Sequence, residues 1–188
     1  MMKPVLALSS LALSLAACTD DAISYSDAVG ISLKAKSSDV VGGVVVDEKA
    51  ITTESGNPFG AFVDDARRTL GANPGAIEVE HVELALGGDS TGVAVLGDVF
   101  AEDVEVLFQI NDTDTTYVVA SGTVMPGVTG PLDLNVSFAS EIVDPIDYAK
   151  MLNGSFKVIT RGAAAPGFDG KSATANLQVT FTFAAFAE

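Results

Sequence analysis

Tryptophan is absent from this chain of 188 residues, and cysteine and histidine each occur once. With Cys18 alone, no intrachain disulfide can form, so the fold must be stabilised by buried surface. With His81 alone, a Ser-His-Asp triad has a single possible base, and the nearby Gly87-Gly88-Asp89-Ser90 lacks the G-x-S-x-G pattern of a nucleophile elbow. One histidine and one cysteine are also too few for a typical zinc site. We therefore predict no catalytic residues.

Basic residues are also few in this chain. Lys and Arg number 10 against 25 Asp and Glu, which gives a formal net charge of −15 at pH 7. Nucleic-acid binding requires clustered basic side chains, and anionic lipid headgroups likewise attract basic segments. The composition therefore excludes a nucleic-acid partner and favours a dispersed acidic domain, for which solubility alone is a sufficient explanation.

The N-terminus has the layout of a secretory signal. Lys3 supplies a positive charge, residues 5–15 are apolar apart from small serines, and Ala16-Ala17 are small residues before a cleavage point. The apolar run is shorter than the roughly 20 residues that a membrane-spanning helix needs. We therefore expect residues 1–17 to be removed.

The segment Leu15-Ala16-Ala17-Cys18 resembles the lipobox of bacterial lipoprotein precursors. The resemblance implies cleavage between Ala17 and Cys18, a diacylglycerol group on the Cys18 thiol and an acyl group on the new amine. It also implies the lipid bilayer as a partner and the cell envelope as the location, with the outer membrane favoured because Thr19 follows the cysteine. The alternative is an ordinary signal peptide in which a cysteine happens to follow the cleavage site.

We expect the mature protein to have two parts. Residues 18–22 form the lipidated cysteine and a short tether, and residues 23–188 form a single β-rich domain. Expected strands cover residues 23–35, 40–53, 77–86, 104–110, 116–124, 132–138, 156–160 and 173–183. In the third, the alternation changes phase at Glu80-His81, which predicts a bulge. The last alternates without exception between apolar and polar residues. Expected helices are 58–70, begun by Asn57-Pro58 and ended by Gly71, a short one within 89–100, and another between Asp144-Pro145 and Asn153-Gly154.

This spacing predicts an all-β fold, mainly an antiparallel β-sandwich of about eight strands, Ig-like or related, with two or three short helices in the connections. An up-and-down β-barrel is the alternative.

Acidic residues are concentrated in the middle of the chain. Between Thr69 and Ala149 there are 14 Asp and Glu and no Lys or Arg. Glu102 and Asp103 form one group, and Asp112 and Asp114 form another in an expected hairpin turn. Clustered loop carboxylates are the oxygen ligands that Ca²⁺ prefers, although no complete EF-hand loop is present. The sequence thus permits a Ca²⁺ site at these residues. The simpler alternative is that they form a solvated acidic face without a bound ion.

These observations favour a membrane-anchored, non-catalytic binding or structural module whose partner is an unknown envelope protein or surface polymer. Two other hypotheses are a carrier of a small apolar ligand and, last, a hydrolase that uses the carboxylates of Glu102, Asp103 and Asp112.

Overall fold

The computed structural model describes residues 23–54, 56–128 and 130–187, and in that part of the chain it contains eight strands and two α-helices. The strands are β1 (Ser24–Lys36), β2 (Val44–Ile51), β3 (Ala76–Leu86), β4 (Phe100–Ile110), β5 (Thr116–Thr123), β6 (Leu132–Val136), β7 (Phe156–Ala164) and β8 (Thr174–Phe186). The helices are α1 (Pro58–Leu70) and α2 (Pro145–Leu152), with short 3₁₀ turns η1 (Ser37–Asp39), η2 (Leu96–Asp98) and η3 (Ser140–Ile142). The predicted all-β class and the strand number are confirmed.

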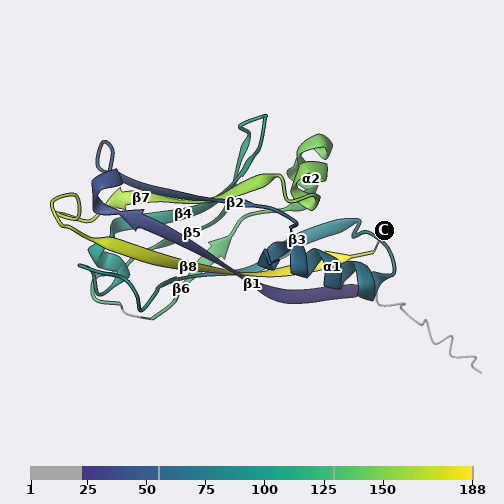
Figure 1. Ribbon diagram of the computed structural model, residues 1–188, viewed down its shortest axis with the longest axis horizontal. Helices are drawn as coiled ribbons and strands as arrows, with labels where there is room; N and C mark the ends of the chain where they lie inside the picture. Colours follow the sequence, from purple (N-terminus) through teal and green to yellow (C-terminus); the bar gives the residue numbers. More distant parts are fainter. Residues whose placement is uncertain (1–22, 55, 129, 188) are drawn as a thin grey trace, which may run out of the picture.

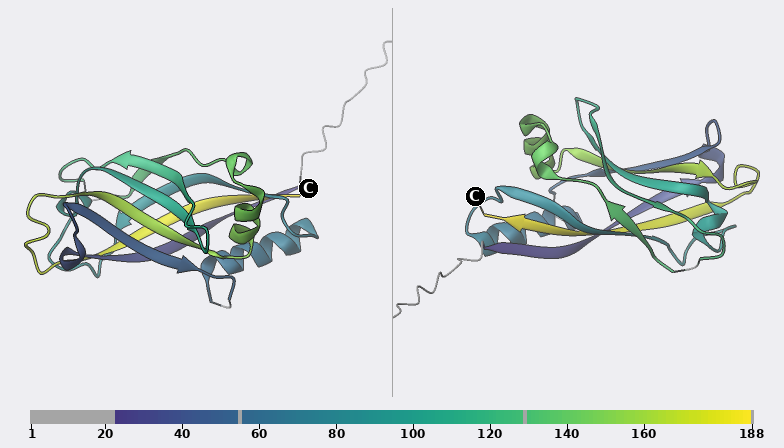
Figure 2. Two further views of the ribbon diagram at one scale, coloured as in Figure 1. Left: turned by 90° about the horizontal axis from the view of Figure 1, so that it is seen from above. Right: turned by 180° about the vertical axis from the view of Figure 1, so that it is seen from behind.

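All strand pairs are antiparallel, and the strand order is β1-β8-β3-β6-β5-β4-β7-β2. Strands β1, β8 and β3 form one layer, and β5, β4, β7 and β2 form the other (Figures 1 and 2). The short strand β6 pairs with β3 at residues 132–134 and with β5 at residues 135–136, so it joins the two layers. The strand order does not follow the chain, so the connections are not those of an up-and-down barrel.

The sheet stays open between its two ends, β1 and β2. These strands come together near their connection, where the Lys34 N–H donates to the Asp47 carboxylate. They form no ladder with each other, because β1 pairs only with β8 and β2 only with β7. The fold is therefore a two-layered sheet with a seam that a barrel would close.

The core between the layers is rich in phenylalanine. In β8 the apolar face predicted from alternation is buried, and Leu177, Val179 and Phe181 have no exposed surface. The Phe108 ring lies 5.0 Å from that of Phe156 and 5.6 Å from that of Phe181, measured between ring centroids. Such tilted and edge-on contacts add to the stabilisation that burial provides.

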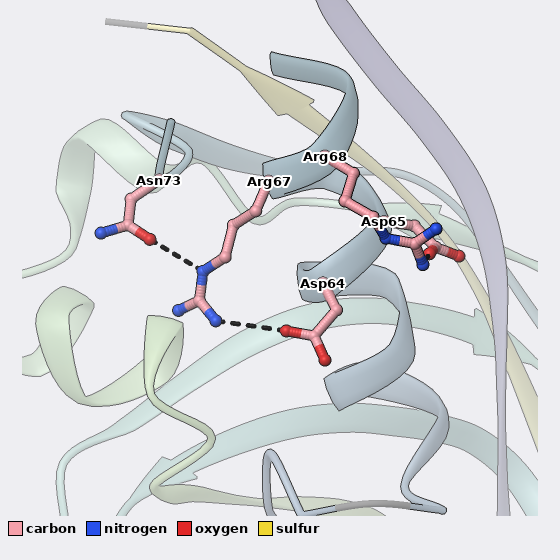
Figure 3. A network of polar contacts seen from close by, with 5 residues as sticks. All are labelled: Asp64, Asp65, Arg67, Arg68 and Asn73. Atoms are coloured by element: carbon pink, nitrogen blue, oxygen red, sulfur yellow. Dashed lines mark hydrogen bonds and ion pairs between the residues drawn. The ribbon is translucent and has the colours of Figure 1, made fainter. Parts of the chain in front are cut away.

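Helix α1 begins and ends as its sequence predicts. The Asn57 side chain accepts a hydrogen bond from the Phe59 N–H, and Gly71 adopts a left-handed φ of 75° at the end. Its buried face packs on β1, and its exposed face carries the ion pairs Arg67–Asp64 and Arg68–Asp65 (Figure 3). Arg67 Nε also donates to the Asn73 side chain at 2.7 Å, which ties the last turn to the following loop.

The expected bulge in β3 is confirmed, since the register with β8 shifts between Val79 and His81. The expected helix within residues 89–100 is wrong beyond the single turn η2. There the Asp98 carboxylate accepts hydrogen bonds from the N–H groups of Ala94 and Val95, which holds a tight turn instead. Strand β2 begins at Val44 rather than at residue 40.

A glycine anchors the end of α2 against the chain before α1. Gly154 has φ 66°, and a Cβ there would lie 2.7 Å from the Thr53 backbone nitrogen. We expect Gly154→Ala to lower the free energy of unfolding by about 3 kcal/mol, because it adds a backbone collision to the left-handed conformation. Gly167→Ala is the control, since Gly167 has φ 76° but open space around it, and it should cost about 1 kcal/mol. Urea unfolding measures both; equal losses would contradict the role of the Thr53 contact.

Candidate binding surface

A shallow depression lies on the outer face of the layer that contains β5, β4, β7 and β2. We call it the outer depression. Its volume is about 550 Å³, and its polar lining consists of Glu102, Asp103, Glu105, Ser121, Thr123, Asn135 and Arg161. Val44, Gly122, Gly162 and Ala163 complete it. Two of the four residues that the sequence nominated for Ca²⁺, Glu102 and Asp103, thus line this hollow.

Strand alternation and register bring these side chains together. In β4, Val104 and Val106 point into the core, so Asp103 and Glu105 point outward. Glu105 pairs with Arg161 of β7 on one side and with Ser121 of β5 on the other, and Ser121 pairs with Asn135 of β6. One row of polar side chains therefore crosses four neighbouring strands.

Two contacts hold carboxylates of the outer depression in place. Arg161 donates from Nε and Nη2 to Glu105 Oε2, at 2.9 and 2.7 Å. The Thr123 hydroxyl donates to the Asp103 carboxylate at 2.6 Å. Both pairs are exposed, so they contribute less to stability than to the arrangement of the surface. With three carboxylates and one guanidinium, the surface suits a partner that brings positive charge or hydrogen-bond donors.

The polar row continues onto β3 through β6. Asp133 lies two residues before Asn135, so both side chains are on the outer face, and Asp133 pairs with Glu83. His81 Nε2 lies 3.3 Å from Glu83 Oε1 and 3.6 Å from Asp133 Oδ1. Ligand atoms of these three side chains lie within 4.8 Å of one another, a donor set that a divalent cation could use. Sequence reasoning missed this cluster because Asp133 is distant in the chain, and only the β3–β6 register reveals it.

The acidic residues nominated for Ca²⁺ lie at opposite ends of β4. Asp112 and Asp114 are in the β4–β5 turn beyond Ile110, and the strand from Asp103 to Ile110 already spans about 23 Å at the rise of a strand. They adopt positive φ angles of 69° and 54°. Lys150 Nζ lies 3.8 Å from the Asp112 carboxylate and donates to the Asn111 carbonyl, so a cationic side chain already occupies the turn.

The separation of these carboxylates along β4 also argues against the hydrolase hypothesis. A pair of glycosidase carboxylates must lie within about 10 Å of each other. Asp112 is too far along β4 to act with Glu102 or Asp103. The structure therefore does not bring the three nominated residues into one site.

The interior offers little room for an apolar ligand. Among the described residues, the space enclosed by Phe59, Phe108, Phe138, Met151 and their neighbours has a volume of about 10 Å³. That is no more than one water molecule occupies. A carrier function would require the aromatic core to open.

Asp147 is the buried carboxylate of α2, with 4% of its surface exposed. It accepts hydrogen bonds from the Tyr117 hydroxyl at 3.0 Å and from the Thr113 hydroxyl at 3.2 Å. Burial, together with the hydrogen bond to Asp147, raises the pKa of Tyr117. This network fastens the β4–β5 turn to α2, so we assign it a structural role.

The predicted lipidation site, Cys18, and the cleavage site between Ala17 and Cys18 lie outside the described residues. In the described part of the chain, neither α1 nor α2 nor any 3₁₀ turn has the length and apolar character to cross a membrane.

No protein-family model matches this chain, and no curated protein matches its sequence. A solved structure described as Desmodium yellow mottle tymovirus is similar with a TM-score of 0.30 and 13% sequence identity, over 100% of this chain and 95% of that one. At these values the similarity supports no argument about function.

Proposed function

We propose that this protein is a lipid-anchored, non-catalytic binding module of the bacterial cell envelope. Cys18 carries the acyl groups that hold it at the outer membrane, and the outer depression engages an envelope protein or a surface polymer. The observation that carries the proposal is the outer depression itself, a hollow lined by hydroxyl, amide, carboxylate and guanidinium groups from adjacent strands.

The outer depression lies at the end of the domain opposite to the end where the N-terminal tether joins β1. Cys18 precedes the start of β1 at Ser24 by six residues, which span about 20 Å at full extension. Ser24 pairs with Phe186 at one end of the domain, whereas Val44 of the outer depression follows the β1–β2 connection at the opposite end. A partner could therefore reach the outer depression from the side away from the membrane.

Photo-crosslinking in intact membranes tests this proposal. A photoreactive amino acid at Thr123, in the outer depression, should form a covalent adduct with the partner. The same amino acid at Glu78, which is exposed near the tethered end of β3, is the matched control and should form none. Reversing the charge of Asp103 with Asp103→Lys should reduce the Thr123 adduct severalfold, because it repels a donor-rich partner.

The proposal would be rejected by adducts of equal yield from both positions, or by no adduct at Thr123. Far-ultraviolet circular dichroism of each variant establishes that the sheet is intact, which separates a lost partner from a lost fold.

A further inference from the structure

The edge of β1 that faces the seam carries unpaired backbone groups. The Ser37 N–H donates to the Ala173 carbonyl at 3.0 Å, in the register of the β1–β8 pair. In an antiparallel pair, every second residue directs both backbone groups to its partner. Odd-numbered residues of β1 therefore bond to β8, and even-numbered residues such as Gly30 and Ser32 direct N–H and C=O away from it.

The facing edge of β2 follows the same rule. The Ala164 N–H donates to the Gly43 carbonyl at 2.8 Å, which places odd-numbered residues of β2 in the ladder with β7. Val44 instead exchanges two hydrogen bonds of 3.1 Å with Val41, away from β7. Glu48 and Ala50 therefore direct their backbone groups toward the seam.

Carboxylates cover the β1 edge on both sides of Gly30 and Ser32. The Asp47 side chain accepts the hydrogen bond from the Lys34 N–H, and the Asp27 side chain accepts one from the Ala28 N–H at 2.8 Å. Such inward or edge charges are a common means of preventing strands from adding to a sheet. The edge is thus protected at Ala28 and Lys34 and left open at Gly30 and Ser32.

A groove lies at this unprotected stretch. We call it the seam groove; it has a volume of about 410 Å³. Gly30, Ile31 and Ser32 form one wall, Lys49 and Ile51 form the other, and the start of α1 closes one end. A Cβ on Gly30 would meet nothing within 4 Å, so the outer face of the strand is uncovered at this residue.

The seam also collects the positive charges that lack a partner. Among the described residues, six of the nine Lys and Arg side chains have a carboxylate oxygen within 4.0 Å. The three that do not are Lys34 and Lys36 of β1 and Lys49 of β2. Glu54 also lines the seam groove, and Asp27 and Asp47 border it, so the positive charge is local to these three lysine side chains, which remain free to pair with carboxylates of a partner.

We propose that the seam groove binds an extended, acidic peptide of another protein as an added strand between β1 and β2. The N–H and C=O groups of Gly30 and Ser32 hydrogen bond to the peptide backbone, and acidic side chains of the peptide lie next to Lys49 and Lys34. A polypeptide is the occupant that matches alternating donors and acceptors at strand spacing. This site shares no residue with the outer depression and does not depend on its proposed function.

Peptide binding to the full mature chain in detergent tests the proposal. The probe is a fluorescein-labelled peptide of about ten residues in which Glu and Val alternate, a typical strand length and pattern. We expect its binding to raise the fluorescence anisotropy and to slow hydrogen exchange at the Gly30 and Ser32 amides. The same peptide with alternate amides N-methylated, or with Lys in place of Glu, should bind at least about tenfold more weakly.

Two variants at one position separate the backbone from the side chain. Ser32→Pro removes the free N–H at an edge position where proline is tolerated, so it should weaken binding about tenfold or more. Ser32→Ala keeps the N–H and should bind as the wild type does. Lys49→Glu should also weaken the binding of the acidic peptide, because it replaces a positive charge by a negative one. It should leave the thermal unfolding temperature unchanged.

Three results would each overturn the proposal: no binding of the acidic peptide below about 1 mM, equal binding of its N-methylated form, or unchanged exchange at the Gly30 and Ser32 amides. Hydrogen-exchange protection of the remaining β1 amides shows that each variant keeps its fold.

Discussion

Replacing Cys18 by alanine should move the protein from the membrane fraction to the soluble fraction. In the proposed lipoprotein, the Cys18 thiol is the only atom that can carry the diacylglycerol group, because the chain has no other cysteine. One acyl chain gives only marginal membrane binding, whereas two or three give stable anchoring. We therefore expect the loss of membrane association to be nearly complete.

Mass spectrometry of the membrane-extracted N-terminal peptide measures this directly. The wild type should yield a peptide that begins at Cys18 and carries two or three acyl chains. Thr19→Ala is the matched control, since it alters the neighbouring residue and leaves the thiol in place, and it should remain acylated. An unmodified wild-type N-terminus, or a Cys18→Ala protein that stays in the membrane, would contradict the anchor.

Replacing Phe108 by alanine should remove much of the stability of the domain. The Phe108 ring is fully buried and lies within 6.4 Å of the rings of Phe138, Phe156, Phe181 and Phe183, between centroids. Truncating a buried phenylalanine costs about 3–5 kcal/mol, because apolar surface is lost and a cavity remains. Domains of this size have a free energy of unfolding of roughly 5–15 kcal/mol. The substitution should therefore remove between about a fifth and all of the stability of the domain.

Urea unfolding of the full chain checks this prediction. Phe186→Ala is the control, because it makes the same substitution in the same sheet at a half-buried position near the end of β8. We expect it to cost less than about 2 kcal/mol. A similar loss for both variants would mean that the aromatic cluster around Phe108 does not dominate the stability of the core.

The sequence predicted best those features whose cause lies within a few residues. Helix α1 follows from the Asn57 cap, the Pro58 start and the left-handed Gly71, and all three positions are as expected. The bulge near His81 follows from a change of phase in the apolar alternation, because each residue of a strand must choose one face. The alternation of β8 likewise determined which side of that strand is buried.

The short helix expected within residues 89–100 shows why such local reasoning fails. The apolar spacing there is weak, and glycine interrupts it. The Asp98 side chain competes for backbone N–H groups and stabilises a turn instead of a helix. The hydrogen bonds of a single side chain can thus outweigh a weak helical periodicity. The sequence pattern does not reveal which side chain will form such bonds.

By itself, then, the sequence determined the all-β class, the excess of acidic residues and the buried face of β8, and it predicts the anchor at Cys18. The strand order, the crossing of β6 and the open seam depend on tertiary structure, because they are set by pairings between strands far apart in the chain. The same pairings put Glu105 beside Ser121 and Arg161, and Asp133 beside His81. Both candidate binding surfaces, the outer depression and the seam groove, exist only because of that register, which no local pattern of residues encodes.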